Sequence, residues 1–272
     1  MQNPYPCSLL EGYNNGYYTI YSTTISGFNS FTEGSILYVD ALKIGRSLIS
    51  GITITNCSTT ISFFSFGASI SNTLNLLTLI NIKGRVFRIT QKSTLVLTSL
   101  TITNNSCMIS GLFQSGCIFY LDSQSLLTIS GANITNVSNV ETPGAFYIEN
   151  SNLTIVNLNI VNTSSILGYG CLYSINSYAV IINSSFSFFQ NGCFQIEKSS
   201  FTISRSKFIN SNISNFAGVY GSTIDCTRCL RLTIDKCVFL GNKNNALDGS
   251  VCFFLNFIDL SIVFDLLLIL LY

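Results

Sequence analysis

Residues 144–162, with the sequence GAFYIENSNLTIVNLNIVN, decide the fold of this chain. Within this stretch, apolar residues occur in pairs spaced two positions apart, the period of a β-strand with one buried face. Short polar segments separate the pairs, and the stretch closes on Asn162, a residue type that tolerates positive φ. The stretch therefore predicts three short strands joined by sharp corners. The apolar pairs are Phe146 with Ile148, Leu153 with Ile155, and Leu158 with Ile160.

The pattern recurs from one end of the chain to the other. Opening glycines stand at Gly116, Gly144, Gly170, Gly192, Gly218 and Gly249. The predicted closing corners form a ladder at Asn56, Asn81, Asn104, Asn136, Asn162, Gln190, Asn210 and Asn242. A unit of this length cannot bury its own apolar face, so copies must stack. We predict an all-β, right-handed parallel β-helix of about eight to nine turns, each with three short strands.

A leucine-rich repeat is the alternative solenoid, because residues 95–104 partly match its pattern and its period overlaps. That fold needs a helical segment in each turn. The rest of each turn here is rich in β-branched residues and serine, which favours strands.

Composition narrows the classes of function. Hydrophobic residues make up 47% of the chain and charged residues only 9%, against about 25% in typical proteins. The net charge is +1 and the basic residues are scattered, whereas nucleic-acid binding needs a basic stripe. We therefore predict no nucleic-acid binding.

Cysteines follow several opening glycines. Cys117, Cys171 and Cys193 are predicted to form one column with Ala145 and Val219. Two interpretations remain open: small buried side chains, or disulfides between neighbouring turns, with Cys171 and Cys193 as the candidate pair.

A second group of cysteines lies near the C-terminus. Cys226 and Cys229 form a CxxC motif, with Cys237 and Cys252 downstream. A local disulfide, free thiols and a zinc site all remain open, although the second CxxC pair typical of zinc is missing. We predict no bound metal or other cofactor.

Asp225, Arg231 and Asp235 are the candidate catalytic cluster, because acids and bases gather only around them. A polysaccharide lyase or hydrolase would need such groups for acid–base work. The chain contains no histidine, and a solvated salt-bridge cluster is the ordinary interpretation.

The predicted β-helix covers residues 31–264, with residues 1–30 as an N-terminal edge or cap and residues 265–272 as an apolar end. Alternatively, residues 252–272 form a transmembrane helix, since the segment is long enough to span a bilayer. Asp259 and Asp265 disfavour that alternative. The first residues have no signal-peptide pattern, and we expect the chain to be a piece of a longer protein.

The motifs Gly144-Ala-Phe-Tyr, Gly192-Cys-Phe and Ser206-Lys-Phe208-Ile-Asn210 resemble the repeats of polymorphic outer-membrane-type proteins. Such repeats also occur in large surface proteins of ciliates and other protists, within the broader pectin-lyase-like class of β-helices. The resemblance implies a surface role in adhesion or display.

Our leading hypothesis is a non-enzymatic, extracellular or cell-surface domain for adhesion, display or the binding of a glycan or surface protein. Membrane attachment would run through the C-terminus or through missing flanking segments. The alternatives are a polysaccharide lyase or hydrolase of the pectin-lyase-like class, and a purely structural spacer.

Overall fold

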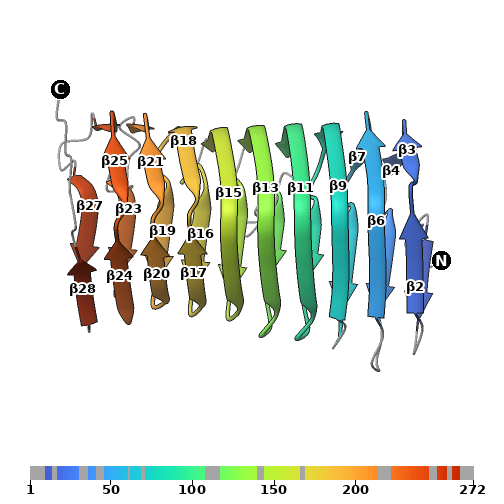
Figure 1. The fold of residues 1–272 in the computed structure, drawn as a ribbon, viewed down its shortest axis with the longest axis horizontal. Coiled ribbons are helices and arrows are strands. Elements are labelled where there is room, and N and C mark those ends of the chain that lie inside the picture. The colour runs from blue at the N-terminus through green and yellow to red at the C-terminus, as the bar shows by residue number, and fades with distance from the viewer. Residues whose placement is uncertain are drawn as a thin grey trace, which may run out of the picture.

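The computed structural model describes residues 10–13, 17–30, 36–40, 46–60, 62–68, 71–107, 117–139, 144–165, 169–213, 222–244, 250–255 and 259–263. Within these ranges every regular element is a β-strand and every strand pair is parallel. The strands wind into a solenoid whose coils follow one another along a single long axis (Figure 1). The predicted parallel β-solenoid is confirmed.

Each coil contributes to two principal sheets, which we name the short-strand sheet and the long-strand sheet. In spatial order, the short-strand sheet contains β1 (Leu10–Tyr13), β5 (Leu37–Asp40), β8 (Phe64–Gly67), β10 (Phe87–Ile89), β12 (Phe119–Leu121), β14 (Phe146–Glu149), β16 (Leu172–Ile175), β19 (Phe194–Glu197), β23 (Ser222–Thr227) and β27 (Ser250–Leu255).

The long-strand sheet has a main path and several shorter strands beside it. The main path contains β2 (Tyr17–Tyr21), β6 (Arg46–Thr55), β9 (Ser71–Lys83), β11 (Thr94–Cys107), β13 (Leu126–Asn139), β15 (Asn152–Ser165), β17 (Tyr178–Ile182), β20 (Ser200–Ser204), β24 (Arg231–Asp235) and β28 (Asp259–Val263). Beside it lie β3 (Thr24–Ser26), β4 (Asn29–Ser30), β7 (Ser58–Thr59), β18 (Ser185–Phe189), β21 (Lys207–Ile209) and β25 (Val238–Leu240). Separately, β22 (Asn212–Ile213) pairs with β26 (Lys243–Asn244).

The described residues place ten strands in the short-strand sheet, which differs from the eight to nine turns predicted. The difference arises at the ends. Within the segment predicted as an N-terminal edge or cap, β1 and β2 pair in register with β5 and β6 and add one more coil.

The C-terminal strands continue both sheets. β27 pairs with β23, and β28 pairs with β24. The alternative of a transmembrane helix concerned residues 252–272, of which residues 252–255 and 259–263 lie in these strands and residues 256–258 and 264–272 lie outside the described ranges. In the described part of the chain, no helix is long and apolar enough to span a membrane.

One coil shows how the sequence makes the corners. Asn150 separates β14 from β15, and β15 bends at Asn157 and Asn162; all three residues have positive φ, between 48° and 58°. Asparagine adopts this left-handed backbone more readily than most residues. The three segments between these corners carry the three apolar pairs of the repeat, and all six side chains are buried.

Stacked side chains fill the interior. Phe64, Phe87, Phe119 and Phe146 form one column with ring centroids 4.7–5.2 Å apart. A second column contains Phe186, Phe208 and Phe239, and the ring of Phe194 packs edge-on against the first two. Each buried aromatic or aliphatic side chain stabilises the fold by about 1.5–3 kcal/mol, so the core depends on neighbouring coils being present together.

A buried serine ladder satisfies polar groups just inside one corner. The backbone N–H of Ser125 donates to the Oγ of Ser151, that of Ser151 to Ser177, and that of Ser177 to Ser199, at 3.0–3.2 Å. Each of the accepting serines lies at the turn between two strands, where its hydroxyl accepts the backbone N–H of the equivalent serine in the preceding coil. Cys229 is buried at the equivalent place in the next coil, where its sulfur lies 3.5 Å from the carbonyl oxygen of Ile196.

Candidate functional site

The predicted corner asparagines form a ladder on the outside of the solenoid. Asn81 donates from Nδ2 to Oδ1 of Asn56 at 3.3 Å, and the bonds that follow, Asn104 to Asn81, Asn136 to Asn104 and Asn162 to Asn136, are each 2.9 Å. All five residues have φ between 53° and 58°. The ladder therefore joins successive coils while supplying the residue type that the corner needs.

Two predicted members of this ladder, Gln190 and Asn242, do not occupy the corner position. Strand pairing between β15 and β18 aligns Asn162 with Phe188, which has φ of 54°, so Gln190 lies two residues too late. In the next coils the corner passes to Asn210 and then Gly241, so Asn242 lies one residue too late.

Asn242 instead forms hydrogen bonds with the backbone of the preceding coil. Its Oδ1 accepts the backbone N–H of Ser211 and its Nδ2 donates to the carbonyl of Phe208. A Cβ at Gly241 would collide with Oδ1 of Asn210, so a larger residue there would displace that side chain, and glycine adopts the φ of 62° without strain.

The cysteines divide into disulfides and free thiols. Cys226 and Cys229 form a disulfide, one of the interpretations left open. Cys107 and Cys117 form a second one, with a sequence separation of 10, which the repeat pattern did not predict. Among described cysteines, Cys57, Cys171, Cys193 and Cys237 are free and buried.

The candidate pair Cys171 and Cys193 is therefore not bonded. The two residues do lie in one column with Ala145, because each precedes a register partner in the short-strand sheet. Side chains in such a column run in parallel, whereas a disulfide needs converging Cβ vectors. Burial raises the pKa of the Cys193 thiol, and the hydrogen bond with Cys171 raises it further, which keeps this thiol protonated.

Cys117 was wrongly placed in that column. Ile118 precedes Phe119, the register partner of Phe146, so Ile118 aligns with Ala145 and Cys117 lies one residue earlier. Val219 lies outside the described residues.

The candidate catalytic cluster does not assemble. Asp225 lies on β23 of the short-strand sheet, whereas Arg231 and Asp235 lie at opposite ends of β24 in the long-strand sheet. The Asp225 carboxylate is buried and accepts hydrogen bonds from Tyr169 Oη at 2.5 Å and Thr227 Oγ1 at 3.1 Å. In the described residues, no three His, Cys, Asp or Glu side chains gather in a way that could hold a metal ion.

A column of tyrosines on the outward side of the short-strand sheet is the more organised group; Tyr120 and Tyr173 are half-buried, and Tyr147 between them is only 4% exposed. Tyr120, Tyr147 and Tyr173 are register partners on β12, β14 and β16, and their rings stack with centroids 5.4 and 5.5 Å apart. Tyrosine follows Gly116 by four residues, and Gly144 and Gly170 by three, so the sequence did carry a signal for this column.

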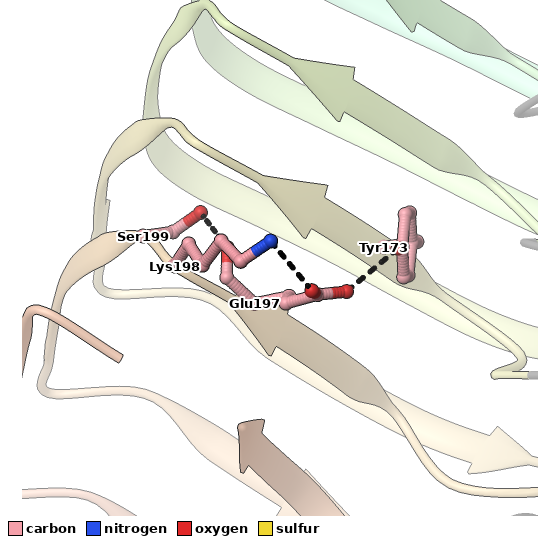
Figure 2. A network of polar contacts seen from close by, with 4 residues as sticks. All are labelled: Tyr173, Glu197, Lys198 and Ser199. Atoms are coloured by element: carbon pink, nitrogen blue, oxygen red, sulfur yellow. Dashed lines mark hydrogen bonds and ion pairs between the residues drawn. The ribbon is translucent and has the colours of Figure 1, made fainter. Parts of the chain in front are cut away.

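Carboxylates lie beside these rings. Tyr147 donates to Oε2 of Glu149 at 3.0 Å, and Tyr173 donates to Oε2 of Glu197 at 3.2 Å. Figure 2 shows the Glu197 carboxylate held between Tyr173 on one side and the Lys198 ammonium, 3.4 Å away, on the other. We call Tyr120, Tyr147, Tyr173, Glu149 and Glu197 the tyrosine–carboxylate face.

The electrostatics of this face keep the tyrosines neutral. Burial and the neighbouring Glu197 raise the pKa of Tyr173 to about 12. Burial and the hydrogen bond to Glu149 raise the pKa of Tyr147 still further. The hydroxyls therefore remain proton donors over the physiological range.

One end of the column carries a cation. The Arg85 guanidinium lies over the Tyr120 ring, 4.8 Å from its centroid, and is almost fully buried. Burial, aided by the nearby Arg88, lowers the pKa of Arg85 to about 10, so the side chain stays charged at neutral pH. This contact covers one face of the terminal ring.

Comparisons of the chain with protein-family models, with curated proteins and with solved structures found no match.

Proposed function

We propose that this chain is a non-enzymatic binding domain of an extracellular or cell-surface protein, and that it contacts a surface protein or glycan through the tyrosine–carboxylate face. The observation that carries the proposal is the in-register stack of Tyr120, Tyr147 and Tyr173 with its ordered carboxylates. As part of the same proposal, the solenoid is assigned to the pectin-lyase-like class with polymorphic outer-membrane-type repeats.

Binding through side chains that are already ordered costs less conformational entropy. Tyrosine is enriched at recognition sites because it offers a large apolar ring with a polar hydroxyl and few rotatable bonds. Here the rings are fixed before any partner arrives, by stacking and by bonds to Glu149 and Glu197. Less conformational entropy is then lost on association.

The disulfides support the proposed location. Disulfides form and persist in oxidising compartments outside the cytosol, and two are present, at Cys107–Cys117 and Cys226–Cys229. Attachment to a membrane, through the C-terminus or through flanking segments, belongs to the proposal as well.

Two alternatives are kept. A polysaccharide lyase or hydrolase would have to work without the group of Asp225, Arg231 and Asp235, since these residues lie on two different sheets. A purely structural spacer needs no ligand, and nothing in that alternative accounts for the ordered tyrosine–carboxylate face.

The test compares Tyr173→Ala with Tyr178→Ala. Tyr178 is an exposed tyrosine on the long-strand sheet and serves as the matched control. Purified chain is screened against a glycan array and against cell-surface proteins. We expect Tyr173→Ala to weaken the interaction by roughly tenfold or more, as at an interface hot spot, and Tyr178→Ala to leave it unchanged.

Two results would count against the proposal. Release of reducing ends or unsaturated sugars from a polysaccharide would support the enzyme. A folded chain that binds no glycan and no surface protein would support the spacer.

A further inference from the structure

The long-strand sheet carries a groove on its outer surface, on a face separate from the tyrosine–carboxylate face. Its volume is about 440 Å³. It runs across β9, β11, β13 and β15, at the corner where each of these long strands first bends. We call it the corner groove.

The hollow exists because the residues at this corner differ in size. The corner is occupied by Leu76, Ser99, Gly131 and Asn157 in four successive coils, all with positive φ. Two small residues thus lie between two larger ones. A Cβ built on Gly131 would meet only the backbone nitrogen of Ser99, 3.9 Å away, so the space above Gly131 is open.

Hydroxyl groups line one side of the corner groove. Thr78 and Thr101 are register partners on β9 and β11, and Ser99 lies at the corner beside them. Within the described part of the chain these three hydroxyls form no hydrogen bond with the protein. Each is therefore available both to donate and to accept.

Two asparagine side chains also line the corner groove, and each is bonded to an asparagine of the following coil. Oδ1 of Asn133 accepts a bond from Asn159 at 3.0 Å, and Oδ1 of Asn157 accepts one from Asn183 at 2.6 Å. Since the oxygen of each amide is engaged with the following coil, its Nδ2 is left to donate. Among the described residues, neither Nδ2 has a protein acceptor.

Apolar surface completes the corner groove, and charge does not contribute to it. Leu76 is 60% exposed and forms one wall, while the buried side chains of Leu100 and Ala132 lie at the base. None of the lining residues is ionisable. Four coils spaced about 4.8 Å apart give the groove a span of roughly 14 Å.

We propose that the corner groove binds an uncharged oligosaccharide. Sugar hydroxyls both donate and accept hydrogen bonds, which matches a lining of hydroxyls and amide donors, and the C–H faces of a sugar ring suit Leu76. A polyanion would find no cation in the lining, and a bound peptide strand would need an unpaired sheet edge, whereas β9, β11, β13 and β15 are paired on both sides here. The inference rests on the proposed role as a non-enzymatic binding domain and names the ligand class.

The experiment fills the corner groove without disturbing the fold. Gly131→Asn introduces the residue that already stands at the same corner in Asn157 and Asn183, with the same left-handed backbone. Gly51→Asn is the matched control, because Gly51 occupies that corner with φ of 68° outside the groove. Thr101→Val removes one hydroxyl at constant shape, with Thr53→Val, in the same column, as its control.

The probes are neutral hexasaccharides of glucose, mannose, xylose and galactose, with hexagalacturonate as the anionic comparison. We expect at least one neutral probe to bind more tightly than hexagalacturonate. Gly131→Asn and Thr101→Val should each weaken its binding by roughly tenfold, and the two controls should leave it unchanged. Thermal unfolding of every variant checks that the fold is retained.

The outcomes separate this inference from the proposed function. Neutral-glycan binding that survives Gly131→Asn and Thr101→Val, or tighter binding of hexagalacturonate, overturns the corner groove and leaves the binding domain standing. Absence of binding to all five probes overturns the corner groove as well. Cleavage of any probe overturns the proposed function itself.

Discussion

Phe188 occupies the same corner of the solenoid as Asn162 in the preceding coil, and the two residues share a left-handed backbone, with φ of 54° and 58°. Asn162 is suited to this backbone and donates to the asparagine ladder. Phe188 has no amide, and its side chain is 54% exposed. A left-handed residue other than glycine or asparagine costs about 1–2 kcal/mol, so this corner is a weak point between two good ones.

Phe188→Asn should therefore stabilise the protein. The variant relieves the backbone cost and places an amide between Asn162 and Asn210, its partners in the neighbouring coils. We expect a gain of about 1 kcal/mol in the free energy of unfolding, measured by urea titration. Phe188→Ala is the control, because it removes the exposed ring and keeps the backbone cost. Equal stability of the two variants would contradict the argument.

The asparagine ladder predicts a second pair of substitutions. Asn104→Gly removes two amide bonds, to Asn81 and from Asn136, while keeping an easy positive φ. Because the ladder is exposed, we expect a loss of roughly 1 kcal/mol. Asn104→Ala should lose about 1 kcal/mol more, since alanine is strained at a φ of 56°. A glycine variant less stable than the alanine variant would show that the corner backbone is unimportant.

Substitutions on either side of a strand test which face is inside. Ile155 is fully buried between its register partners Ile129 and Ile181. Ile155→Asp places an unpaired carboxylate there, which costs several kcal/mol and should unfold neighbouring coils. Val156→Asp, one residue along on the outward face, should melt close to wild type. Thermal unfolding followed by circular dichroism distinguishes the two, and similar melting of both variants would contradict the assignment of faces.

The disulfide between Cys107 and Cys117 should contribute measurable stability. Its sequence separation of 10 corresponds to roughly 2–3 kcal/mol in the chain-entropy treatment of loops. We expect replacement of both residues by serine to lower the free energy of unfolding by about that amount. Alkylation of the denatured, non-reduced chain should label Cys57, Cys171, Cys193 and Cys237. Labelling of Cys107 or Cys117 would show that the bond is absent.

Asp225 predicts a pH dependence of stability. Burial raises the pKa of its carboxyl above the ordinary value of about 3.9, while hydrogen bonds from Tyr169 and Thr227 partly lower it. The folded state thus binds the proton more tightly than the unfolded state. The stabilisation that this protonated carboxyl contributes is fully present below a pH of about 3.9. It is lost as the pH rises through the folded-state pKa of Asp225.

Asp225→Asn removes this contribution, so wild type should lose stability relative to the variant as pH rises through that window. Urea midpoints measured at a series of pH values give the comparison. Tyr169→Phe removes a bond that favours the carboxylate and should move the window to higher pH. Parallel profiles for wild type and Asp225→Asn would contradict the assignment.

The strands were predictable because their signal is local. Alternation such as Leu153-Thr154-Ile155 reports directly on one buried face, and the closing asparagines report on positive φ. The register near Phe188 and Gly241 was not predictable from residue type, since the corner requires only a backbone conformation. Hydrogen-bond pairing of β15, β18, β21 and β25 decides which residue occupies it.

The candidate site needed information that a repeat pattern does not contain. Asp225 and Arg231 are close in sequence, but a corner at Arg228 sends them to different sheets. The tyrosines are far apart in sequence, and the strand register of β12, β14 and β16 aligns them. Cys107 and Cys117 escaped prediction because the repeat pattern aligns residues about one coil apart, whereas these two are separated by only 10 positions.

The stacking of coils also determines how the domain would unfold under a pulling force. Backbone hydrogen bonds between coils run along the long axis, and each coil contacts mainly its neighbours. A load applied to the two ends of the chain would peel terminal coils one at a time. The coil between Leu126 and its register partner Asn152 holds 26 residues within an axial rise of roughly 4.8 Å. Each released coil of that size would lengthen the tether by roughly 80 Å. A domain built this way would absorb a pull in many small steps and keep its remaining coils intact.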